Sequence, residues 1–183
     1  MYLVDGYNLL HAMGILHGKV GPFGLQKARL GLLGLLHAIY KDQSSAVTVV
    51  FDAAHAPPGA SEDEDYEGIT IRWAVHQESA DDLIESLITR CSAPKQLTVV
   101  SDDHRIQHAA LRRRCKALGC LEYLEWLERR RRDRHRSESD ETSKPENLSE
   151  EDTQYWLRQF AELEGSRHLK KLSDPVEWKD IDT

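Results

Sequence analysis

The sequence predicts an α/β fold in which a mostly parallel sheet is covered by helices. Within the first 136 residues, short β-branched and apolar runs alternate with segments of helix length. This alternation is typical of parallel strands joined by crossover helices. The strongest runs are apolar at successive positions, as in strands that are covered on both faces. A chain of 183 residues has room for one such domain and an appendage.

We expect about five strands. The three strong candidates are residues 2–4 (YLV), 46–51 (AVTVVF) and 96–100 (QLTVV). The two weaker candidates are residues 69–73 (ITIRW) and 115–118 (CKAL). The stretch at 53–68 combines Pro, Gly and acidic side chains. We therefore expect it to be a mobile loop overhanging the end of the second strand.

Four helices are expected among these strands. They cover residues 24–41, 79–91, 103–114 and 119–136. In the last segment, apolar side chains recur at a spacing of three residues, at Leu121, Leu124 and Leu127. This spacing is typical of a helix with one buried face.

The composition changes after this last helix. Residues 137–147 are polar and contain a proline, which predicts a linker. Apolar side chains at helical spacing follow, at Trp156, Leu157, Phe160 and Leu163. The predicted organisation is therefore a domain at 1–136, a linker at 137–147, and an amphipathic helix with a tail at 148–183.

Charge and apolar content exclude some classes of protein. No apolar run reaches the roughly 18 to 20 residues of a membrane helix, and we expect a cytoplasmic protein without a membrane partner. The net charge of −7 argues against bulk attraction of nucleic acid, although residues 129–136 hold six Arg against one Asp. This block could grip phosphates or could be a solvated helix end. The three cysteines lack a CxxC spacing and are expected to be free thiols.

Aspartates follow the three strong strands, at Asp5, Asp52 and Asp102, and Asp103 comes next. In a parallel sheet these ends share one edge, where open α/β folds place their ligands. Two charges about 5 Å apart repel by roughly 3 kcal/mol at an effective dielectric near 20. Such a group would take up protons or hold a cation, and carboxylate oxygens favour Mg²⁺ or Mn²⁺. The simpler alternative is that each aspartate only caps a turn or helix.

A further acidic contribution could come from the helix at 79–91. With Ser79 as the N-cap, Asp81 and Asp82 fall in the first turn, where they also suit the helix dipole. Glu85 lies four residues after Asp81, so both can face the same site.

Four motifs in this order resemble the NYN domains, a branch of the PIN-like nucleases, and most closely the bacterial YacP-like subfamily. They are LVDGYNLLHA, VVFDA, ESADDLIE and VVSDD. The resemblance covers residues 2 to 136 and extends loosely into the helix after the linker. It implies a PIN-like three-layer sandwich with a C-terminal helical extension, and an acidic site that uses a divalent metal to cleave RNA.

Carried over position by position, the resemblance implies catalytic roles for Asp5, Asp52, Asp81 and Asp102. The expected metal ligands are Asp5, Asp81 and Asp102. Four residues are expected to bind substrate or support the site: Asn8, Glu85, Asp103 and Arg105. Asn8 would orient a carboxylate, a water or a phosphate, Gly6 would allow a sharp turn, and Arg105 would contact a phosphate.

The sequence thus predicts a ribonuclease that depends on Mg²⁺ or Mn²⁺ and is expected to cut internally, leaving a 5′ phosphate and a 3′ hydroxyl. Its RNA could be mRNA or rRNA in a ribosomal context. Two alternatives stay open. One is an RNA-binding or ribosome-associated adaptor of the same fold with little activity, and the other is a regulatory domain phosphorylated on Asp52.

Overall fold

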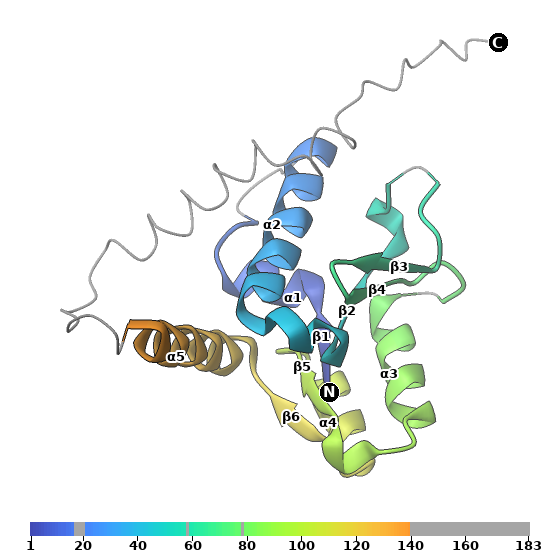
Figure 1. Ribbon diagram of the computed structural model, residues 1–183. Helices are drawn as coiled ribbons and strands as arrows, with labels where there is room; N and C mark the ends of the chain where they lie inside the picture. The colour runs from blue at the N-terminus through green and yellow to red at the C-terminus, as the bar shows by residue number, and fades with distance from the viewer. Residues whose placement is uncertain (17–20, 58, 78, 140–183) are drawn as a thin grey trace. The chain divides into compact units, whose positions relative to one another are not determined.

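The computed structural model describes residues 1–16, 21–57, 59–77 and 79–139, and its strands form one six-stranded sheet (Figure 1). The strands are β1 (Tyr2–Asp5), β2 (Val47–Phe51), β3 (Asp63–Tyr66), β4 (Ile69–Trp73), β5 (Thr98–Val100) and β6 (Lys116–Leu118). Their order is β3-β4-β2-β1-β5-β6, and only the β3–β4 pair is antiparallel. The predicted mostly parallel sheet is confirmed.

The first strand of the chain lies at the centre of the sheet. β1 pairs in parallel with β2 on one side and with β5 on the other. The register sets Asp5 beside Val50 of β2, and it sets Val4 beside Val100 of β5. The carboxyl ends of these three strands therefore meet at one edge, with β1 in the middle.

Within the described residues, five helices flank the sheet: α1 (Gly6–Ala12), α2 (Pro22–Tyr40), α3 (Ala80–Arg90), α4 (His104–Arg112) and α5 (Cys120–Ser139). Three short 3-10 helices are η1 (Lys41–Ala46), η2 (Ala53–His55) and η3 (Pro94–Gln96). The four expected helices are confirmed, whereas α1 was not expected. It follows β1 without a loop, because the Asp5 carboxylate caps it by accepting a hydrogen bond from the Asn8 backbone N–H.

The helices form a layer on each face of the sheet. α3 and α4 cover one face, where Leu3, Val50 and Val99 belong to the same buried apolar cluster as Ile84 and Ile106. On the other face, α5 contacts α1 and α2, and Leu9, Leu10 and Leu36 are buried. The layers bury apolar side chains on both sides of the parallel strands, as their unbroken apolar runs predict.

Four aromatic residues that are far apart in the sequence pack together on the α2 and α5 face. Five ring pairs among Tyr2, Tyr40, Tyr123 and Trp126 have centroids 5.3–5.9 Å apart. The hydroxyl groups of Tyr40 and Tyr123 share a hydrogen bond of 3.0 Å. This cluster joins the central strand to α2 and α5.

The arginine block of α5 takes part in this packing. The Arg130 guanidinium lies over the rings of Tyr40 and Trp126, at 5.2 and 5.3 Å from their centroids. Arg134 donates to the backbone carbonyl of Ile39, near the end of α2, at 2.7 Å. Cations are favourable at a helix C-terminus, where carbonyl groups lack partners. Part of the block thus fastens α5 to α2.

The expectation of a loop throughout 53–68 was wrong. η2 forms at its start, and β3 then pairs with β4 through a two-residue hairpin at Glu67 and Gly68. Both turn residues have positive φ, 50° and 85°, as in the primed turns that match strand twist. β3 was missed because its sequence, DEDY, has low strand propensity and forms a half-exposed edge strand.

Other expectations have mixed outcomes. Cys91, Cys115 and Cys120 are free thiols, as expected, and the first is only half-buried. No helix in the described ranges is long and apolar enough to span a membrane. α5 runs three residues into the predicted linker, to Ser139. The rest of that linker and the helix predicted at 148–183 lie outside the described residues.

Gly6 is needed for a close approach rather than for an unusual backbone angle. A Cβ added at Gly6 would come within 2.7 Å of three ring carbons of Phe51. We predict that Gly6→Ala lowers the free energy of unfolding by about 1–3 kcal/mol, because overpacking forces a buried ring to move. Urea denaturation measures this change.

Gly21→Ala is the matched control, because an added Cβ there meets nothing within 4 Å. Its expected cost is below about 1 kcal/mol, since alanine is only a poorer N-cap than glycine. Equal losses in the two variants would contradict the explanation.

Candidate active site

Asp5 is a buried carboxylate at the end of the central strand, with 4% of its surface exposed. Its Oδ1 accepts from the Asn8 backbone at 3.1 Å, and its Oδ2 accepts from Asn8 Nδ2 at 2.6 Å and Ser101 Oγ at 3.2 Å. Burial raises the pKa of Asp5, nearby Asp103 adds to the rise, and the three hydrogen bonds oppose it. Of the predicted roles of Asn8, the structure shows the orientation of a carboxylate.

Ser101 and Asp103 are joined to Asp5 from the neighbouring strand end. Ser101 follows β5 in the position beside Asp5, is fully buried, and accepts from the Asp103 backbone N–H at 3.1 Å. The Asp103 carboxylate caps α4 by accepting from the backbone N–H groups of Arg105 and Ile106 at 2.6 and 3.3 Å. Asp103 is therefore a helix cap whose charge acts on Asp5.

Asp81 brings a further carboxylate to this group from α3. Ser79 is the N-cap of α3, as predicted, and its Oγ accepts from the Asp82 backbone N–H at 3.2 Å. Asp81 therefore lies in the first turn. Partial burial raises the pKa of Asp81, and the charges of Asp103 and Asp5 raise it further. We call Asp5, Asp81 and Asp103 the acidic group, because each is within electrostatic reach of the other two.

Asp102 is turned toward a different helix. Its Oδ1 accepts from the Cys120 backbone N–H at 2.8 Å and so caps the start of α5. A Cβ on Gly119 would lie 3.3 Å from this oxygen, so the glycine leaves room for the cap. Burial, followed by the charges of Asp102 and Asp5, raises the pKa of Cys120 to about 12. Asp102 and Asp5 therefore both act on Cys120, and one oxygen of Asp102 is bound to α5.

Asp52 lies further along the edge. It is two residues beyond Val50, the register partner of Asp5, and its Oδ1 accepts from the Ala54 backbone N–H at 2.8 Å. Its charge acts on Tyr7, whose pKa is raised mainly by burial and whose hydroxyl accepts from Arg29 at 2.9 Å. Asp52, one of the four predicted catalytic aspartates, therefore lies near the Tyr7–Arg29 pair.

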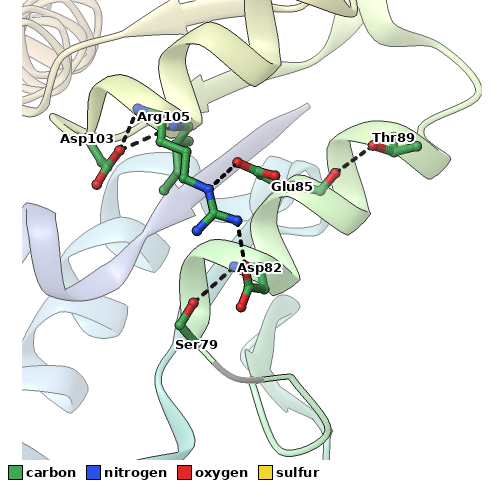
Figure 2. A network of polar contacts seen from close by, with 7 residues as sticks. Ser79, Asp82, Glu85, Thr89, Asp103 and Arg105 are labelled. Atoms are coloured by element: carbon green, nitrogen blue, oxygen red, sulfur yellow. Dashed lines mark hydrogen bonds and ion pairs between the residues drawn. The ribbon is translucent and has the colours of Figure 1, made fainter.

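Arg105 and Glu85, two of the predicted supporting residues, bind each other. Figure 2 shows the Arg105 side chain between two carboxylates of α3, with Nε at 2.7 Å from Glu85 Oε1 and Nη2 at 2.6 Å from Asp82 Oδ1. Hydrogen bonding to Arg105 lowers the pKa of Asp82, and the two carboxylates raise the pKa of Arg105. These bonds engage two of the five N–H donors of the guanidinium.

The chemistry of the acidic group suits a hard divalent cation. Burial and mutual repulsion disfavour the charged forms of Asp5 and Asp81, and a cation would offset both effects. Among the residues that the structure describes, no three His, Cys, Asp or Glu side chains are grouped as direct ligands of one metal. Mg²⁺ commonly takes one or two carboxylates and completes its shell with water and substrate phosphate. The donors fit Mg²⁺ or Mn²⁺ held in this way.

The three-layer fold, with acids at the carboxyl edge of a mostly parallel sheet, is consistent with a nuclease-type α/β domain. The chain belongs to the YacP-like NYN domain family, which residues 2–164 match. This confirms the family expected from the motifs.

Two crystal structures are similar to the chain. Rae1 (YacP) from Bacillus subtilis is 27% identical, with a TM-score of 0.58 over 77% of this chain and 82% of that one. A mutant of the same Bacillus subtilis protein is 26% identical, with a TM-score of 0.53 over 74% and 79% of the two chains. No curated protein matches the chain.

Two residues of the site were not predicted. Ser101 binds Asp5, and Asp82 binds Arg105. The parallel register could have identified Ser101, because alignment of the two strand ends puts it beside Asp5. Asp82 had no comparable signal, since its first-turn position is already explained by the helix dipole.

The burial of Asp5 has a consequence for stability. A carboxyl whose pKa is higher in the folded than in the unfolded chain favours folding at low pH, and this contribution is lost as the pH rises through the folded pKa. Without divalent cations, we predict that Asp5→Asn melts at a higher temperature than the unaltered protein at pH 7. The difference should shrink as the pH falls toward the ordinary carboxyl range.

Asp42→Asn serves as the control, because Asp42 is exposed on η1, at the opposite edge of the sheet. Thermal melts over a series of pH values compare the three proteins. A lower melting temperature of Asp5→Asn at neutral pH would contradict a desolvated charge at this position.

Proposed function

We propose that the chain is a ribonuclease of the cytoplasm that cuts RNA internally with Mg²⁺ or Mn²⁺ at the acidic group. The observation that carries the proposal is the buried Asp5, held beside Asp81 and Asp103 at the carboxyl edge of the sheet. Membership of the NYN family supports the same reaction class, with RNA as the substrate. Burying a carboxylate next to two others opposes folding, which makes a purely structural role a costly one.

One or two carboxylates of the acidic group would bind the cation directly, the remaining charge would act at longer range, and Asp102 has an oxygen that could contribute. Asn8 and Ser101 fix the Asp5 carboxylate by donating to it. Three of its roughly four acceptor positions are used, which leaves capacity for a cation or a water. When bound, the cation would lower the pKa of a water and offset charge on the leaving 3′ oxygen.

The first prediction for activity concerns Asp5 and the metal. With Mg²⁺ or Mn²⁺, we expect the unaltered protein to produce new internal 5′-phosphate ends in total RNA or in RNA of intact ribosomes. Asp5→Asn should lower the cleavage rate by at least about a hundredfold, the usual size of effect when a charge-stabilising group is lost. Sequencing of 5′ ends measures cleavage and also reveals the target.

The exposed Asp42→Asn variant should cleave like the unaltered protein, and chelation by EDTA should abolish both activities. If no metal-dependent ends form while the protein still binds RNA, the adaptor alternative is favoured instead.

The neighbouring aspartates Asp102 and Asp103 give a second test. Asparagine can keep the capping hydrogen bond at either position, so the two variants differ mainly in which charge is lost. We expect Asp103→Asn to weaken Mn²⁺ binding about tenfold and Asp102→Asn to weaken it less, because Asp103 acts on both Asp5 and Asp81. Isothermal titration calorimetry measures both affinities, and the reverse order would assign the cation to Asp102.

A further inference from the structure

Arg105 links the two helices that present Asp81 and Asp103. It is the second residue of α4, and its backbone N–H donates to the Asp103 carboxylate at 2.6 Å. Its side chain reaches α3, where it binds Asp82 at 2.6 Å and Glu85 at 2.7 Å (Figure 2). Arg105 therefore binds Asp103 through its backbone N–H, and its side chain binds two residues of α3 that follow Asp81.

Hydrogen bonds fix the backbone of both residues that bind Arg105, which are Asp82 and Glu85. Asp82 and Glu85 are three residues apart, so they lie on one face of α3. The Asp82 backbone N–H donates to Ser79, and the Glu85 carbonyl accepts from Thr89 Oγ1 at 2.9 Å (Figure 2). A planar guanidinium that donates through two different nitrogens fixes direction as well as distance. The bridge thus sets how the first turn of α3 lies against the start of α4.

We infer that Arg105 is a positioning residue that fixes the separation of Asp81 and Asp103 by bridging α3 to α4. The inference rests on the proposed function, because these aspartates belong to the group that is proposed to hold the cation. Exposed ion pairs contribute little to global stability, and 54% of the Arg105 side chain is exposed. The bridge therefore acts on local geometry, while buried residues such as Ile84 and Ile106 hold the two helices together.

The main alternative is that Arg105 contacts an RNA phosphate directly. The two roles differ in what happens when Asp82 and Glu85 lose their charges. A positioning arginine would fail without its partners, whereas a phosphate-binding arginine would be released and would still bind RNA.

The experiment compares Arg105→Ala, Arg105→Lys, the double variant Asp82→Asn/Glu85→Gln and the combined triple variant Arg105→Ala/Asp82→Asn/Glu85→Gln. Arg72→Ala is the matched control, because Arg72 binds Asp63 through two nitrogens between the strands β4 and β3. For each protein, calorimetry gives the Mn²⁺ affinity, RNA cleavage gives kcat and KM, and a thermal melt gives Tm.

The direction in which Arg105→Ala changes the Mn²⁺ affinity distinguishes an effect of the lost charge from an effect of altered geometry. Loss of a positive charge beside the acids would by itself strengthen cation binding. Positioning predicts the opposite, about fivefold or more weaker binding, with kcat lowered about 10- to 100-fold and KM changed less than about twofold. Arg105→Lys should retain part of the activity, because a single ammonium cannot replace the fork.

The double variant should lose kcat to a similar extent, and the triple variant should lose little more, because residues that act as one unit are not additive. Arg72→Ala should keep the Mn²⁺ affinity and kcat of the unaltered protein.

Three outcomes would overturn the inference. Arg105→Ala could bind Mn²⁺ as tightly as the unaltered protein, it could raise only KM while the double variant stays active, or Tm could fall in step with kcat in every variant. Failure of the proposed function is distinguishable: the unaltered protein would then cleave no RNA, yet it would still bind Mn²⁺ more tightly than Arg105→Ala.

Discussion

The burial of one carboxylate, that of Asp5, is the constraint on which the arrangement of the site depends. A desolvated carboxylate persists only if donors surround it, and its donors come from two separate elements. Asn8 supplies two hydrogen bonds from α1, and Ser101 supplies one from the end of β5. The same bonds start α1 directly after β1 and tie the β5 end to the central strand. The hydrogen bonds at this edge are therefore arranged around Asp5, the residue on which the proposed reaction most depends.

A bend at Asp102, just after β5, sends the adjacent Asp102 and Asp103 to different partners. Successive side chains of an extended segment point to opposite faces of a sheet. Val99 belongs to the buried cluster under α3 and α4, and Ser101 continues on that side, where it binds Asp5. The charge of Asp103, after the bend, acts on Asp5 and Asp81. Asp102 instead caps α5. Of these two adjacent residues, Asp103 thus belongs to the acidic group, whereas Asp102 makes a structural hydrogen bond to α5.

The sequence was sufficient for the mostly parallel sheet, for four of the five helices in the described part of the chain and for the Ser79 cap, because apolar runs and caps are local signals. It was insufficient for β3, whose acidic residues pair only because the Glu67–Gly68 turn folds them back onto β4. For the site, strand ends identified Asp5, but the partners of Arg105 depend on how α3 packs against α4. Residue spacing carries no information about contacts between two helices, so Glu85 was expected to support the site as an acid.

Several arginines of the described residues are committed to bonds within the chain, which bears on how RNA could bind. Asp82 and Glu85 engage Arg105, and Arg130 and Arg134 fasten α5 to α2. With a net charge of −7, the protein would repel a polyanion unless cations compensate. In the proposed reaction, a cation at Asp5 would supply that compensation where the scissile phosphate must sit. Cation and RNA would then favour each other's binding by the same factor, since linkage between two ligands is reciprocal.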